Sequence, residues 1–249
     1  MPIALITGAS SGIGRATAVV LAKAGFSLIL TGRRRERLEE VARQLASTPT
    51  HLLVFDVRDQ AATEAALAGL PTEFADIDVL INNAGNAHGL GPIQEGSVAD
   101  WDAMLDGNVK GLLYVSRAVL PGMTQRQRGH VINIGSIAGH EAYPNGNVYC
   151  ASKAAVAMLS KSMRLDLLPH GVRVAEVNPG AVQTEFAQVR FKGDEERAAA
   201  VYKGFQPLTA EDVADVIGFM VTRPPHVNIA EVLLLPAAQA STMHFRREG

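Results

Sequence analysis

The stretch Thr7-Gly8-Ala9-Ser10-Ser11-Gly12-Ile13-Gly14 decides the fold of this chain. It follows the apolar run 2–6, which is typical of a buried strand, and it precedes a helical pattern over 15–24. A strand, a glycine-rich turn and a helix in this order form a phosphate site, because free amide groups at the helix start face the anion. The three glycines allow, in turn, a tight bend, a close approach of a diphosphate and close packing of the helix on the strand. An ordinary turn between strand and helix is the alternative.

The alternation of strand and helix continues along the chain. Further apolar runs predict strands over 27–30, 51–55, 78–81, 129–134, 172–177 and 228–235. Helical patterns between them cover 36–45, 60–70, 101–121, 151–168 and 212–222. No linker, internal repeat or low-complexity tract divides the sequence. We therefore expect one α/β domain over residues 1–249, a Rossmann-like doubly wound parallel sheet of about seven strands with helices on both faces.

The composition narrows the class of protein. The chain is 47% hydrophobic and 19% charged with a formal net charge of -2, which fits a compact protein and gives no sign of a nucleic-acid or membrane-surface partner. The single cysteine, Cys150, excludes an internal disulfide, and the seven histidines show no paired ligand spacing, so no metal is expected. No apolar run approaches the roughly 20 residues that span a bilayer, and the N-terminus lacks a signal-sequence pattern. These features favour a cytoplasmic location.

Two arginines follow the second expected strand, where a dinucleotide places its adenosine ribose in folds of this kind. An acidic residue there binds the 2′-hydroxyl of NAD, whereas an arginine accommodates the 2′-phosphate of NADP. No acidic residue precedes Glu36, and Arg33 and Arg34 stand in its place. A solvated helix start is the alternative, but arginine at a helix N-terminus opposes the helix dipole. The pair therefore favours NADP(H) as the cofactor.

Polar and small residues also follow the third and fourth expected strands. Asp56 can accept a hydrogen bond from an adenine amino group, or it can cap the turn before the next helix. In Asn82-Asn83-Ala84-Gly85, the small residues let a ring lie against the backbone and the amides can lock neighbouring strands. Asn108 lies inside an expected helix, where asparagine is mildly unfavourable, so it has either a polar role or a packing and bending role.

Tyr149 and Lys153 lie four residues apart at the entry to the expected helix 151–168, so their side chains share one face. An ammonium beside a phenol favours the phenolate and lowers the tyrosine pKa from its usual value of about 10. Such a tyrosine can exchange a proton with an alcohol or carbonyl oxygen near neutral pH. Ser136 follows the fifth expected strand, at the edge where parallel sheets bind ligands. Cys150 adjoins the tyrosine, but helix geometry turns it away and no histidine lies nearby, which disfavours a nucleophilic role.

The segment 181–200 has mixed character and is a candidate mobile lid over the site. A carboxylate substrate would need a cationic partner, and Arg190 and Lys192 on this segment are the candidates. Solvated loop charges are the alternative reading of both residues.

Taken together, these residues resemble the short-chain dehydrogenase/reductase superfamily over nearly the whole chain. The resemblance is carried by Thr7-Gly8-x-x-x-Gly12-Ile13-Gly14, Asn82-Asn83-Ala84-Gly85, Asn108, Ser136, Tyr149-x-x-x-Lys153 and Pro179-Gly180. Residues 32–38, 118–123, 189–194 and 225–229 are similar to the NADP-dependent 3-hydroxy acid dehydrogenases within it. The chain departs from that group at Asn86-Ala87-His88 and Glu141-Ala142-Tyr143-Pro144, and its loop after Gly180 is one residue shorter.

The resemblance implies an NADP-dependent oxidoreductase that interconverts a small 3-hydroxy acid, of the serine, allo-threonine or 3-hydroxypropionate type, and its 3-oxo acid or semialdehyde. It implies that Tyr149 is the general acid and base, that Ser136 holds the substrate oxygen, and that Lys153 binds the nicotinamide ribose. It also implies that Asn108 anchors a water linked to the lysine, and that the chain forms a homotetramer through 101–121 and 151–168. The expected cofactor-binding residues are Gly8, Ser10, Ser11, Gly12, Ile13, Gly14, Arg33, Arg34, Asp56, Val57, Asn83, Ala84, Gly85, Tyr149, Lys153, Pro179, Gly180, Val182 and Thr184.

Two other functions stay open at this stage. A reductase of the same superfamily could act on an uncharged ketone or aldehyde, because pocket loops decide the substrate. A non-catalytic dinucleotide sensor could share the fold, although it need not retain Ser136, Tyr149 and Lys153 together.

Overall fold

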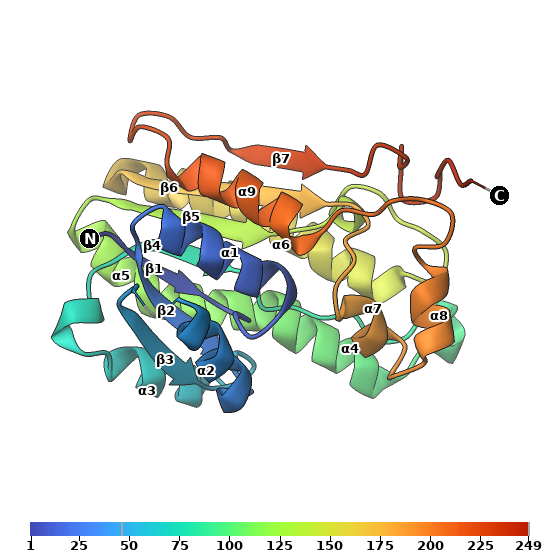
Figure 1. Ribbon diagram of the computed structural model, residues 1–249, viewed down its shortest axis with the longest axis horizontal. Helices are drawn as coiled ribbons and strands as arrows, with labels where there is room; N and C mark the ends of the chain where they lie inside the picture. The colour runs from blue at the N-terminus through green and yellow to red at the C-terminus, as the bar shows by residue number, and fades with distance from the viewer. Residues whose placement is uncertain (46, 249) are drawn as a thin grey trace.

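Seven strands form one parallel sheet in the computed structural model, which describes residues 1–45 and 47–248 (Figure 1). Their order is β3-β2-β1-β4-β5-β6-β7, and every neighbouring pair is parallel. The order reverses between β1 and β4, which is the point where doubly wound sheets bind ligands at their carboxyl ends. The strands are β1 (Ile3–Ile6), β2 (Ser27–Gly32), β3 (Thr50–Val54), β4 (Ile77–Asn82), β5 (Gly129–Ile134), β6 (Val172–Pro179) and β7 (Glu231–Leu234). The expected fold class is therefore confirmed.

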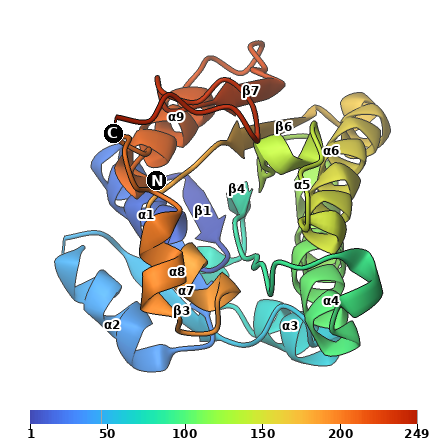
Figure 2. The same cartoon turned by 90° about the vertical axis from the view of Figure 1, so that its right-hand side faces the viewer.

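Helices cover both faces of the sheet, as Figure 2 shows from the end of the strands. One layer consists of α1 (Gly12–Lys23), α2 (Arg35–Gln44) and α9 (Ala210–Val221), and the other of α3 (Gln60–Ala68), α5 (Gly111–Gln125) and α6 (Asn147–Leu167). Side chains alternate along β1, so that Ala4 and Ile6 join the first core whereas Ile3 and Leu5 join the second. Two buried cores thus hold the strand ends in fixed positions.

The expected helix 101–121 differs in detail from the one observed. It consists of α4 (Val98–Leu105), a π-helical turn over Asp106–Lys110 and α5, which continues past Pro121 to Gln125. Proline removes a helical hydrogen bond, but two contacts hold the last turn in place. Met123 is fully buried, and Arg126 donates to the Ile77 carbonyl at 2.7 Å. These contacts offset the proline, so the helix ends later than the sequence pattern suggests.

Two short helices, α7 (Phe186–Arg190) and α8 (Glu195–Ala200), form most of the expected lid segment. They lie over the carboxyl ends of the strands (Figure 2). No helix among the described residues is long and apolar enough to cross a membrane.

Residues 236–248, which follow β7, pack on their own chain. The Gln239 Oε1 atom accepts a hydrogen bond from the Ala181 amide at 2.8 Å. Further on, the Arg247 guanidinium lies 5.1 Å from the centre of the Phe205 ring. The tail therefore contacts both the segment that leads from β6 into α7 and the segment that follows α8.

Candidate active site

A cleft opens at the carboxyl ends of the strands and collects almost all of the expected cofactor residues. Its walls include Gly8, Ser10, Ser11, Gly12, Ile13, Arg33, Arg34, Asp56, Val57, Asn83, Ala84, Gly85, Ser136, Tyr149, Lys153, Pro179, Gly180, Val182 and Thr184. Gly14 does not line the cleft. A Cβ atom there would lie 2.4 Å from the Gly8 carbonyl oxygen, so this glycine serves the close packing of α1 on the turn that follows β1.

The glycine turn holds the start of α1 open toward the cleft. Gly8 and Gly12 have φ angles of 65° and 51°, a left-handed conformation that glycine adopts at little energy. Asn83 fixes the turn from β4, because its side-chain amide donates to the Thr7 carbonyl at 2.8 Å. No side chain caps α1, so its first amide groups remain available for an anion. The arrangement fits the diphosphate of a dinucleotide.

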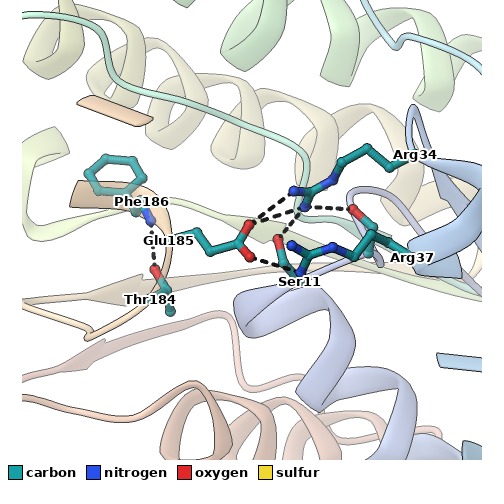
Figure 3. Close-up of polar contacts among 7 residues, drawn as sticks. Ser11, Arg34, Arg37, Thr184, Glu185 and Phe186 are labelled. Atoms are coloured by element: carbon teal, nitrogen blue, oxygen red, sulfur yellow. Dashed lines mark hydrogen bonds and ion pairs between the residues drawn. The ribbon is translucent and has the colours of Figure 1, made fainter. Parts of the chain in front are cut away.

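Arg34 lies at the ribose end of the cleft, among hydroxyl groups of the glycine turn (Figure 3). Its Nη2 atom donates to the Ser10 and Ser11 hydroxyls at 3.2 and 3.0 Å. The guanidinium of Arg34, which follows β2, and the two hydroxyls of the glycine turn suit a phosphate group, since all three can donate hydrogen bonds to its oxygens. Arg33 also lines the cleft, but its side chain is 67% exposed.

Asp56 is held by an arginine that the sequence reading did not single out. Arg58 donates to both carboxylate oxygens of Asp56, at 2.6 Å in the shortest contact. Burial alone would raise the pKa of Asp56, but Arg58 and Arg33 together hold it below its usual value. Asp56 also caps the turn before α3, because its Oδ1 atom accepts a hydrogen bond from the Arg58 amide at 3.0 Å, whereas the helix itself is capped by Asp59 through the Ala62 amide.

Tyr149, Ser136 and Lys153 converge at the inner end of the cleft, and all three are buried. Burial raises the pKa of Tyr149 well above 10, whereas a hydrogen bond with Ser136 opposes that effect. The Nζ atom of Lys153 donates to the Ile134 carbonyl at 2.9 Å. The expected lowering of the tyrosine pKa is therefore not seen, because burial is the largest effect on it and raises it. In this state Tyr149 is a phenol that can donate a proton.

Burial also lowers the pKa of Lys153 to about 8, and Glu176 on β6 partly offsets this effect. Sequence reasoning missed Glu176, although an acidic residue within the expected strand 172–177 was a visible signal. The Glu176 side chain is buried and its Oε1 atom has no hydrogen-bond partner among the described residues. A Cβ atom on Gly135 would lie 2.3 Å from that oxygen, so the glycine makes room for the acid beneath the site.

Asn108 sits in the π-helical turn and is buried beside the lysine. Its Oδ1 atom accepts from the Asn86 amide at 2.7 Å, and its Nδ2 atom donates to the Asn86 carbonyl and to Ser152 Oγ, both at 2.9 Å. A Cβ atom on Gly85 would lie 3.0 Å from Asn108 Oδ1 and 3.7 Å from Lys153 Nζ. The polar role is thus favoured over simple helix bending, since the side chain ties the loop after β4 to α6.

A second hollow adjoins Tyr149 and contains Arg190, which was the first candidate for binding a carboxylate. The Arg190 guanidinium lies 5.5 Å from the centre of the Tyr149 ring and 5.4 Å from that of Tyr143. Its Nε atom donates to the Gly89 carbonyl at 3.2 Å. Lys192, the other candidate, is paired with Asp100 at 2.9 Å. The geometry therefore separates the two cations, and only Arg190 stands beside the tyrosine.

Several residues of the site escaped the sequence reading because no local sequence pattern marks them. Phe186 packs on Tyr149 with ring centres 5.6 Å apart, and Tyr143 lies under Arg190. Tyr143 belongs to a stretch that had been noted only as a departure from related sequences. The other cleft residues that were not predicted are Gly32, Phe55, Arg58, Asn86, Gly107, Ile134, Gly135, Glu185 and Val189.

The chain is similar to known proteins over almost its whole length. The family model for the short chain dehydrogenases matches residues 2–195. The NADP-dependent 3-hydroxy acid dehydrogenase YdfG of Salmonella typhi is 47% identical over 239 residues, 96% of each chain. Sulfoacetaldehyde reductase 2 of Chromohalobacter salexigens is 46% identical over 240 residues, 96% of this chain and 95% of that protein.

The fold can also be compared with a solved structure, the closed form of serine dehydrogenase complexed with NADP+. The TM-score is 0.94 at 45% sequence identity, over 99% of this chain and 100% of that chain. The match to these proteins covers almost the whole chain. It therefore includes the glycine turn, Asn82, Asn83 and the buried Tyr149 and Lys153. On this evidence the chain belongs to the short chain dehydrogenase family.

Proposed function

We propose that this protein is an NADP(H)-dependent oxidoreductase that interconverts a small 3-hydroxy acid and its 3-oxo acid or semialdehyde. The observation that carries the substrate class is the position of Arg190, whose guanidinium stands 5.5 Å from the ring of Tyr149. A cation at this distance from the proton donor can hold a carboxylate while the carbonyl two atoms away meets the phenol. The relatives that match over 96% of this chain include an NADP-dependent 3-hydroxy acid dehydrogenase, which supports the same class.

The residues of the cleft fit NADP(H). The uncapped start of α1 suits the diphosphate, and Arg34 with the Ser10 and Ser11 hydroxyls suits the 2′-phosphate. Small residues, Ala84 and Gly85, leave space beside the backbone for a ring. Thr184 and the backbone after Pro179 also line the cleft, where they can hold the carboxamide.

In the proposed mechanism the nicotinamide supplies or accepts the hydride. During reduction the Tyr149 hydroxyl donates its proton to the carbonyl oxygen of the substrate. During oxidation the Tyr149 phenolate oxygen accepts the proton of the substrate alcohol. The Ser136 hydroxyl donates a hydrogen bond to the substrate oxygen and stabilises the charge that develops there. Lys153 carries a positive charge below about pH 8, which favours the phenolate that remains after the transfer.

A pair of matched variants tests the substrate class. Arg190→Met is expected to raise KM for malonic semialdehyde about 10- to 100-fold, because a charge-assisted hydrogen bond contributes roughly 1.5–3 kcal/mol. Propanal lacks the carboxylate, so its KM should stay within about twofold. Lys192→Met serves as the control, since that lysine is paired with Asp100. An unchanged KM for the acid in Arg190→Met, or an equal change for propanal, contradicts the assignment.

A sulfonate is the second candidate for the anionic group. A guanidinium binds either anion through its planar fork, and a relative of nearly equal identity is a sulfoacetaldehyde reductase. Steady-state assays with NADPH against malonic semialdehyde, sulfoacetaldehyde and propanal decide between the candidates. We expect kcat/KM for at least one of the anionic aldehydes to exceed that for propanal at least tenfold. Equal values for all three would favour the reductase of uncharged carbonyl compounds.

We further propose that the chain forms a homo-oligomer, a tetramer by family resemblance, and that it works in the cytoplasm. Met158 and Leu165 on α6 are 63% and 73% exposed, which leaves apolar surface on one of the two helices expected at the interface. Light scattering should give a mass of about four chains for the wild type. Met158→Glu with Leu165→Glu should give a smaller species, and an unchanged mass would move the interface elsewhere. Fractionation of cells that express the protein tests the location.

A further inference from the structure

Glu185 crosses the cleft from the lid side to the ribose side. It follows Thr184, whose hydroxyl accepts a hydrogen bond from the Phe186 amide at 3.2 Å and fixes the turn before α7 (Figure 3). From this turn its Oε2 atom lies 3.2 Å from both terminal nitrogens of Arg34, and its Oε1 atom lies 3.1 Å from Arg37. One carboxylate thus bridges two guanidinium groups at the start of α2.

The contacts of Arg34 decide what this bridge does. The same Nη2 atom that contacts Glu185 also contacts the Ser10 and Ser11 hydroxyls. Burial alone would raise the pKa of Glu185, but Arg34, Arg37 and Ser11 together hold it below its usual value. The group is therefore an anion at neutral pH, and it occupies the guanidinium that faces the hydroxyl groups expected to bind the 2′-phosphate.

We propose that Glu185 is a specificity-determining residue that competes with the 2′-phosphate of NADP(H) for Arg34. The inference rests on the proposed cofactor. A phosphate that reaches Arg34 must displace the Oε2 atom of Glu185, and the two anions repel each other at this distance. Arg37 remains as the ion-pair partner of the displaced Glu185 carboxylate, so the exchange does not leave that charge unpaired.

NAD(H) interacts differently with Glu185 than NADP(H) does. It presents a 2′-hydroxyl, which carries no charge and can donate a hydrogen bond to a carboxylate. The chain lacks an acidic residue at the end of β2, and Glu185 brings one to that position from the opposite side of the cleft. Glu185 therefore opposes NADP(H) without opposing NAD(H), and it reduces the preference that the arginines create.

Direct binding measures this effect without any turnover. Nucleotide fluorescence titrations give Kd for NADPH and for NADH with the wild type and with Glu185→Gln, which keeps the shape and removes the charge. We expect Kd for NADPH to fall about threefold to tenfold, since exposed ion pairs of this kind are worth up to about a factor of five each. Kd for NADH should stay within about twofold. An unchanged or weaker affinity for NADPH, or an equal gain for NADH, overturns the proposal.

Two further variants separate the exchange at Arg34 from a general charge effect. Glu196→Gln removes the same charge from exposed α8, where the described residues give Glu196 no ion pair, and it should leave both Kd values unchanged. In an Arg34→Met background Glu185→Gln should bring no gain for NADPH, because the shared guanidinium is absent. A gain in either case overturns the proposal. The role of Glu185 is measured by the ratio of Kd values between variant and wild type. The proposed cofactor is tested separately, because a wild type that binds NADPH no more tightly than NADH would contradict it.

Discussion

Two opposing influences act on the hydroxyl of Tyr149. Burial favours the neutral phenol, and the hydrogen bond with Ser136 favours the phenolate. Burial dominates, so the protein without cofactor holds a protonated tyrosine at neutral pH. This is the form that reduction requires, because the carbonyl oxygen must receive a proton.

Removal of that hydroxyl tests its role directly. Tyr149→Phe is expected to lower kcat about 10²–10⁴-fold, the usual contribution of general acid–base catalysis, while Kd for NADPH changes little. Tyr114→Phe is the matched control, since Tyr114 lies on α5 and does not line the cleft. Steady-state rates and fluorescence titrations give both quantities. Turnover by Tyr149→Phe at half the wild-type rate or more would exclude the tyrosine as the proton donor.

The ammonium group of Lys153 loses its proton within a pH range that enzyme assays can reach. Burial lowers its pKa to about 8, so the ammonium is present below that pH and is lost above it. Because the ammonium favours the developing phenolate, kcat/KM for NADPH in the reduction should fall above about pH 8, by about tenfold per unit. Lys153→Met should show a low rate without this decline. A wild-type profile that stays flat from pH 7 to 9.5 would contradict the assignment.

At the scale of elements, the sequence predicts those parts of the site that follow regular strands and helices. The glycine turn, Asn83, Ser136 and the spacing of Tyr149 and Lys153 all depend on local patterns, and the fold places them around one cleft. Each lies at the end of a strand or on one helix face, where the period of the element fixes the direction of the side chain.

The remaining parts depend on contacts between segments far apart in the chain. The π-helical turn around Asn108 is held by Asn86 and Ser152, which lie 22 and 44 residues away. Glu185 meets Arg34 across a separation of 151 residues. Neither pairing leaves a local signal, so a pattern along the sequence could not reveal it. The continuation of α5 past its proline belongs to the same class, because Met123 and Arg126 stabilise it through tertiary contacts.

The crossing of α1 and β1 yields a prediction of its own. Gly14→Ala would place a Cβ atom 2.4 Å from the Gly8 carbonyl oxygen, which is a backbone atom and cannot move freely. We expect a loss of about 1–3 kcal/mol in the free energy of unfolding, with weaker NADPH binding because the start of the helix shifts. Gly91→Ala is the control, since a Cβ atom there meets nothing within 4 Å. Urea unfolding of both variants measures the difference, and equal stabilities would contradict the close packing.

At the scale of the whole molecule, the sheet carries a titratable group that plays no part in the site. His130 lies on β5 with 1% of its surface exposed, and neither ring nitrogen has a hydrogen-bond partner among the described residues. Burial, with a smaller effect of Arg173, lowers its pKa from 6.5 to about 3. The folded protein therefore excludes a proton that the unfolded chain binds below about pH 6.5.

The sign of the resulting pH dependence follows from that difference. The unfolded state binds more protons between pH 6.5 and 3, so the protein becomes less stable as the pH is lowered through this range. From this one residue, the free energy of unfolding should decrease by about 1.4 kcal/mol for each unit by which the pH is lowered, or about 2 kcal/mol between pH 6.5 and 5. His130→Leu should remove that part of the decline without breaking a hydrogen bond, whereas His226→Leu, at an exposed position, should retain it. Urea unfolding at pH 7 and at pH 5 measures both slopes. If His130→Leu lost stability as steeply as the wild type, the acid sensitivity of the fold would have to originate in other groups, and His130 would take up its proton equally in the folded and the unfolded state.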